Sequence, residues 1–208
     1  MAGDVVQRGG GRASAAVFRA RLRRGADVRI LSPKNLCTDQ DLLEYPDHHP
    51  SSSFLWETRR LLSTTISNWS TVRRLVDGCD VLHCITEPYS PVAALAAGSR
   101  PLFITAHGTY AVLPLTWRRD ALLLRYAYRR ARRVLCVSRY TERKLLDRVK
   151  NARTGIVPEG VEDDCVQRQV EESAKPTGSD ILSVGTEKQR KGCSGAIERS
   201  ADMRTRMT

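Results

Sequence analysis

Short apolar segments alternate along this chain with longer amphipathic segments, and this alternation limits the fold more than any other feature of the sequence. Six segments have the composition of strands: 27–33, 80–85, 102–107, 133–138, 154–160 and 180–185. Helical patterns occupy other parts of the chain: 14–24, 56–76, 90–98, 117–132 and 139–149. Strands separated by helical segments form βαβ units, and short, nearly continuous apolar strands are typical of sheets covered on both faces. We therefore predict an α/β fold, with a parallel sheet and helices on both faces.

One polar segment interrupts this pattern. Residues 47–53, "DHHPSSS", predict a loop in which His48 and His49 are exposed residues rather than metal ligands. The six cysteines include no C-x-x-C pair, so we expect neither a zinc site nor a disulfide framework. No metal ion is expected anywhere in the chain.

The basic residues are concentrated in one segment. The chain has a formal net charge of +11, and between residues 118 and 153 thirteen Lys or Arg stand against three acidic residues, an excess of ten. Such a segment attracts anions, whether nucleic acid, lipid headgroups or phosphorylated small molecules, although a solvated helical face explains the same residues equally well. In the helix expected at 117–132, arginines form the exposed face and four apolar residues form the buried one: Leu122, Leu123, Leu124 and Tyr126.

A histidine stands at the end of the most clearly bounded apolar run. The run Leu102–Thr105 lies between Pro101 and Gly108, and His107 follows it. In open α/β sheets, ligands bind at the carboxyl ends of the strands. His107 is therefore either a site residue or a polar residue leaving the core.

Six short motifs, in order along the chain, resemble the family 4 glycosyltransferases of GT-B fold. They are "GGG" (9–11), "DVLHCITEPYSP" (80–91), "ITAHGT" (104–109), "RRVLCVSRYTERKLL" (132–146), "IVPEGVEDD" (156–164) and "ILSVGTEKQRKG" (181–192). The resemblance covers about residues 5 to 192. It implies a Rossmann-like amino-terminal domain and hexosyltransferase-like transfer of a sugar from a nucleotide-sugar to an acceptor.

The resemblance also implies roles for individual residues. His107 matches the cleft histidine that contacts the transferred sugar, and we expect it to be catalytic. Gly9, Gly10 and Gly11 open a helix and match the loop that lies against the donor diphosphate, where backbone N–H groups bind anions; a flexible turn is the alternative. Lys191 falls on the phosphate-binding lysine. Glu87 and Tyr89 are expected on the acceptor side, unless they are merely solvated loop residues.

The match weakens in its second half. Thr186 stands where the family has an arginine, and a hydroxyl cannot supply the bidentate fork that arginine gives a phosphate. Nothing after Gly192 resembles the donor-binding E-x7-E motif. We expect an acceptor-side domain over residues 1–165, a linker over 166–179, and an incomplete donor domain with a disordered tail over 180–208. A chain truncated in this way is expected to transfer sugar slowly or not at all.

The function expected from the sequence is therefore glycosyl transfer, without a cofactor, from a nucleotide-sugar to a carbohydrate or lipid-linked acceptor. We expect a cytoplasmic protein, peripheral at the inner membrane face through contact with anionic lipid, because no segment is long and apolar enough to span a bilayer. Nucleic acid is not an expected partner. The alternatives are a non-catalytic basic module that binds a membrane surface or nucleic acid, and a structural remnant without activity.

Overall fold

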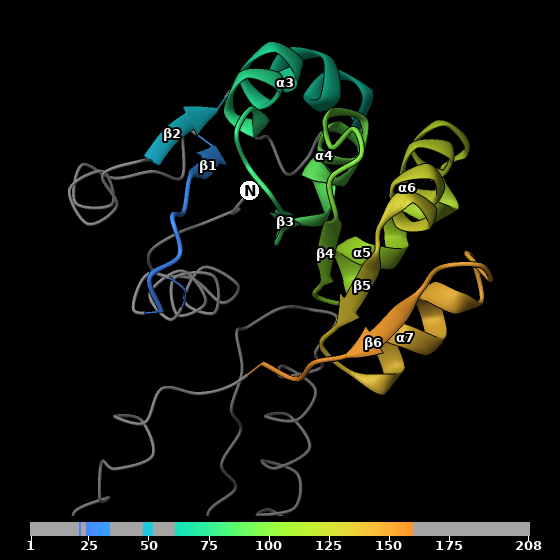
Figure 1. Ribbon diagram of the computed structural model, residues 1–208. Coiled ribbons are helices and arrows are strands. Elements are labelled where there is room, and N and C mark those ends of the chain that lie inside the picture. Colours follow the sequence, from blue (N-terminus) through green and yellow to red (C-terminus); the bar gives the residue numbers. More distant parts are fainter. Residues whose placement is uncertain (1–20, 22–23, 34–47, 52–60, 160–208) are drawn as a thin grey trace, which may run out of the picture. The chain divides into compact units, whose positions relative to one another are not determined.

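The computed structural model describes residues 21, 24–33, 48–51 and 61–159. The chain divides into two compact units, residues 1–163 and 164–208, and every described residue lies in the first. The strands are β1 (Ile30–Pro33), β2 (His48–Ser51), β3 (Leu82–Cys84), β4 (Leu102–Ala106), β5 (Arg133–Cys136) and β6 (Thr154–Ile156). The helices are α3 (Leu61–Val76), η2 (Glu87–Tyr89), α4 (Ser90–Ala96), α5 (Thr109–Val112), η3 (Leu113–Thr116), α6 (Arg118–Arg130) and α7 (Arg139–Leu146), η being 3-10 helix. Figure 1 labels the main ones.

Strands β3 to β6 form one parallel sheet in their order along the chain. Leu82 pairs with Leu102, and Ile104 pairs with Val134. Each connection between neighbouring strands contains a helix, as a parallel arrangement requires. The prediction of an α/β fold with a parallel sheet is confirmed.

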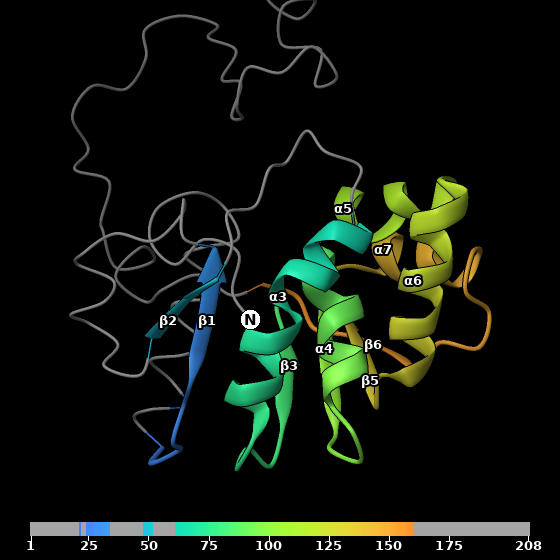
Figure 2. The same cartoon turned by 90° about the horizontal axis from the view of Figure 1, so that it is seen from above.

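Helices α3, α4 and α6 lie over the same face of this sheet (Figure 2), and the burial of the strand residues follows from that. In β4, Leu102, Ile104 and Ala106 are buried, whereas Phe103 and Thr105 are only partly covered. Alternate strand residues point to opposite faces, so the first three pack under the helices. The described helices thus account for full burial of one face of the sheet.

Two helix ends occur where the sequence places them. Gly78 follows α3 with a φ of 77°, and Gly98 follows α4 with a φ of 58°. Glycine adopts this left-handed backbone without a steric penalty, which is why it ends helices. Pro91 lies in the first turn of α4, where its missing N–H costs nothing.

Three expectations need correction. Residues 48–51 are not a loop: they form β2, which pairs in parallel with β1, because backbone pairing does not require apolar side chains. Helices α5 and η3 fill the segment after His107, where no helix was expected. The third correction concerns the buried face of α6.

On α6, the buried residues recur at helical spacing: Asp120, Ala121, Leu124, Ala127 and Tyr128. Of the four residues expected there, Leu124 is buried and Leu123 packs partly buried against the core. Leu122 and Tyr126 are exposed instead. Small alanines let the helix approach α4 closely, so larger side chains one position away are forced outward.

Candidate active site

The carboxyl ends of β3, β4 and β5 meet at one rim of the sheet. Because these strands are parallel and in register, Ile85, His107 and Ser138 follow them at the same edge. The backbone N–H of Val137 donates to the carbonyl of Ala106 at 3.2 Å, which holds two of these ends together. The predicted position of His107 at this rim is confirmed.

Three groups hold His107 in place. Its backbone N–H donates to Oε1 of Glu87 at 2.6 Å, its Nε2 lies 2.9 Å from the carbonyl oxygen of Ile85, and its Nδ1 lies 2.5 Å from Oε1 of Glu159. The side chain is 20% exposed, so the ring is reachable from solvent. His107 is therefore a fixed polar group at the rim and is not enclosed by apolar side chains.

The hydrogen bonds of the ring constrain its protons. The carbonyl of Ile85 and an ionised Glu159 are both acceptors, whereas a neutral imidazole carries only one N–H. A ring with hydrogen on both nitrogens donates to both partners, whereas a neutral ring donates from Nε2 to the Ile85 carbonyl and accepts at Nδ1 from a protonated Glu159. In either state one shared proton lies between Nδ1 and the carboxyl group.

Glu87 is a buried carboxyl group whose main partner is backbone. It is 3% exposed, and burial is the main reason why its pKa is raised above the ordinary value, while the nearby His107 acts in the opposite direction. The residue follows β3 in η2, where Pro88 turns the chain toward α4. Glu87 therefore connects the ends of β3 and β4.

Tyr89 lies inside the domain. It is 1% exposed and belongs to the hydrophobic core. Neither Tyr89 nor Glu87 is a solvated loop residue, and an acceptor reaches their side chains only if this segment moves. Their acceptor-side role remains a prediction.

Glu159 was not among the residues expected at the site. It follows β6, the fourth parallel strand of the sheet, and so comes to the same rim as His107, 52 positions away in the chain. The signal was present, because a polar residue after the end of a parallel strand is a candidate rim residue. The predicted residues Gly9, Gly10, Gly11 and Lys191 lie outside the described residues.

A glycine beside His107 is required by its backbone. Gly108 has a φ of 107°, a conformation that L side chains rarely adopt, and a Cβ there would lie 3.8 Å from Oγ1 of Thr141. A side chain at residue 108 would therefore have space, and the positive φ is what requires glycine there. Thr141 belongs to α7, whose first turn is capped by Ser138 through a 3.1 Å hydrogen bond from the Thr141 N–H.

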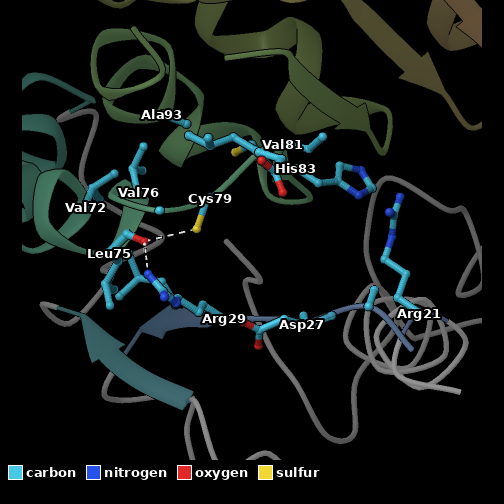
Figure 3. Close-up of a pocket in the computed structure, with 17 residues that line it drawn as sticks. Arg21, Asp27, Arg29, Val72, Leu75, Val76, Cys79, Val81, His83 and Ala93 are labelled. Carbon is cyan, nitrogen blue, oxygen red and sulfur yellow. Dashed lines mark hydrogen bonds between the residues drawn. The ribbon is translucent and has the colours of Figure 1, made fainter. Parts of the chain in front are cut away.

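A cavity of about 400 Å³ lies elsewhere, between the segment that leads into β1 and strand β3. Figure 3 shows His83 and Arg21 directed toward it, with Val72, Val76 and Ala93 on another side. Arg29 donates to the carbonyl of Asp77 at 2.7 Å and so holds the β1 segment against the end of α3. This cavity does not include His107.

Glu87 yields the first testable prediction. Glu87→Ala leaves the His107 N–H without its acceptor and is expected to lower the free energy of unfolding by about 1–3 kcal/mol. Glu87→Gln keeps an acceptor oxygen and removes a buried charge. Because the folded-state pKa of Glu87 is raised, the wild type loses stability as pH rises through that pKa. The free energy of unfolding of Glu87→Gln should therefore increase relative to that of the wild type as pH rises. Denaturant unfolding at several pH values measures both effects; equal losses for the two variants would contradict the assignment.

The described residues contain no group of three or more His, Cys, Asp or Glu side chains that could hold a metal ion. Within the same residues Cys79, Cys84 and Cys136 are free thiols. None of the described helices is long and apolar enough to cross a membrane.

Comparison with known proteins identifies the family. The sequence-family model described as Glycosyltransferase Family 4 matches residues 8–164, about three quarters of the chain. A search of curated proteins found no match. The matched segment contains the whole parallel sheet and the rim with His107, Glu87 and Glu159. The chain therefore belongs to glycosyltransferase family 4.

Proposed function

We propose that this chain provides the acceptor-side half of a glycosyl-transfer site, in which a sugar passes from a nucleotide-sugar to a carbohydrate or lipid-linked acceptor. Membership of family 4 supports sugar transfer in general. The observation that carries the proposal further is His107 at the carboxyl rim of a parallel sheet, where Glu159 contacts its partly exposed ring and Glu87 accepts from its backbone N–H.

In this proposal, Nε2 of His107 contacts the transferred sugar. In the structure Nε2 faces the Ile85 carbonyl. In the proposed complex a sugar hydroxyl replaces this carbonyl as the hydrogen-bond partner of Nε2, whose position is already fixed. Glu159 orients the ring through Nδ1, as a carboxylate orients histidine in many active sites. Glu87 holds the backbone and does not touch the substrate.

The remaining roles concern residues outside the described part of the chain. We assign Gly9, Gly10 and Gly11 to the donor diphosphate, because backbone N–H groups at a helix start bind anions. Lys191 would add a positive charge to the same phosphates. The reaction needs neither cofactor nor metal under this assignment, and we place it at the cytoplasmic face of the membrane.

Four histidines make the proposal directly testable by NMR. Selective labelling gives ring signals for His48, His49, His83 and His107 alone. Titration with a panel of nucleotide-sugars and free sugars is expected to move the His107 signal in a saturable manner and to leave His83 unchanged. His107→Asn identifies the signal. Saturable movement of His83 with a constant His107 signal would refute the role of the rim.

A further inference from the structure

Helix α6 presents apolar and basic side chains together on its outer face. Leu122 is 68% exposed and Tyr126 is 45% exposed, one helical turn apart and opposite the buried stripe of the helix. Arg118, Arg119 and Arg129 are exposed around them. Asp120 is the sole acidic residue of α6, and it is buried, so the outer face of the helix carries positive charge alone.

Helix α3 carries a second exposed apolar stripe. Leu62, Ile66 and Trp69 recur at helical spacing and are 51%, 67% and 41% exposed. Arg73 continues the same stripe one turn later. Soluble monomers rarely leave such a row of large apolar side chains uncovered, so this stripe indicates a binding surface.

The two stripes belong to one layer of helices. Helices α3 and α4 pack together, α4 packs against α6, and Figures 1 and 2 both show the three helices side by side. The N–H of Leu61 also donates to the buried carboxyl group of Asp120, which joins the first turns of α3 and α6. We call the exposed side chains of these two helices the α3–α6 face.

The charges of the α3–α6 face indicate what covers it. Helix α4 has no charged residue, and the exposed charges of α3 and α6 are all arginines. The acidic residue that follows α3, Asp77, pairs with Arg100 at 3.6 Å. A second copy of this chain would bring arginines against arginines in a symmetric contact. Charge complementarity therefore favours an anionic occupant.

We propose that the α3–α6 face docks on an anionic lipid bilayer. Arginines attract the negatively charged headgroups, while Leu62, Ile66 and Leu122 enter the boundary of the acyl chains. Trp69 and Tyr126 have the amphipathic rings that favour the membrane–water interface. Nucleic acid fits less well, because exposed leucine and isoleucine gain little from phosphates.

This inference does not depend on the proposed function. Binding to the bilayer uses α3 and α6, whereas sugar binding uses the rim at His107, so each can fail without the other. The sequence placed Leu122 and Tyr126 in the core and gave no role to the α3 stripe. The α3–α6 face therefore combines positive charge with exposed apolar side chains, whereas the sequence indicated positive charge alone.

Flotation of the full chain with vesicles tests the proposal. We expect strong binding to phosphatidylcholine vesicles that contain phosphatidylglycerol, weak binding to phosphatidylcholine alone, and a loss of binding at high salt. Brominated acyl chains are expected to quench tryptophan fluorescence, and Trp69→Phe should remove most of the quenching. Equal binding to both vesicles, or no quenching by the bound chain, would overturn the proposal.

Variants locate the surface. Arg118→Glu is expected to weaken binding at least fivefold, since one basic residue near an anionic surface contributes about 1 kcal/mol. Leu122→Asp and Ile66→Asp should each weaken it about tenfold or more, because each removes a side chain that enters the bilayer. Lys150→Glu and Val157→Asp make the same chemical changes at exposed positions outside α3 and α6 and serve as controls. Equal losses in the controls, or binding of single-stranded nucleic acid through these residues without vesicle binding, would contradict the assignment.

Discussion

Substitution of the rim histidine is expected to lower sugar transfer about 100-fold, the usual loss when a fixed polar donor is removed from a transition state. The substitution is His107→Ala, made at the matching histidine of a full-length family 4 enzyme. Both kcat and kcat/KM should fall together, since the proposed contact strengthens as the sugar is transferred. Steady-state kinetics with saturating donor and acceptor measure the effect.

Stability provides the control for this substitution. In the present chain His107→Ala removes contacts of a partly exposed side chain and is expected to cost about 1 kcal/mol. Substitution of the matching Glu159 by Gln should lower kcat less, because the amide still orients the ring. An alanine variant that unfolds, or one that raises KM with kcat unchanged, would show that His107 acts by structure or by ground-state binding alone.

Acid is expected to destabilise the domain through a different histidine. Burial is the main cause that lowers the pKa of His83 from 6.5 to about 3. Its Nε2 lies 2.9 Å from Oγ1 of Thr105 on the neighbouring strand. The unfolded chain takes up a proton below pH 6.5 while the folded domain does not, so unfolding is favoured as pH falls through this window. The expected slope is about 1.4 kcal/mol per pH unit between pH 6.5 and about 3.

A neutral replacement isolates this contribution. His83→Gln keeps a polar group for Thr105 and cannot take up the proton. The difference in the free energy of unfolding between wild type and variant should change by about 1.4 kcal/mol per pH unit. The contributions of carboxylates to this difference cancel, because the same carboxylates titrate in both proteins. Parallel stability curves for the two proteins between pH 6.5 and 4 would show that His83 takes up its proton while folded.

The sequence was sufficient for the sheet and for the position of His107. Each strand of the parallel sheet is a short apolar run, and Gly78 and Gly98 end their helices through backbone preferences that local sequence determines. Once the strands are parallel, the residue after each strand must lie at one rim. For this reason the sequence alone predicts the position of His107.

Other features depend on contacts between distant residues. Strand β2 forms because its backbone pairs with β1, although its composition is typical of a loop. The orientation of α6 follows from how closely Ala121 and Ala127 allow it to pack, so Leu122 was wrongly assigned to the core. The position of Glu159 after a strand marks it as a rim residue, but its pairing with His107 joins residues 52 positions apart and follows only from the folded sheet.

A crystal structure of the chain soaked with a nucleotide-sugar or its acceptor tests the central claim most directly. The account predicts density for a sugar at the carboxyl rim, with a hydroxyl within hydrogen-bond distance of Nε2 of His107 and the ring still bound to Glu159. Density in the 400 Å³ cavity between β1 and β3, with an empty rim, would contradict it.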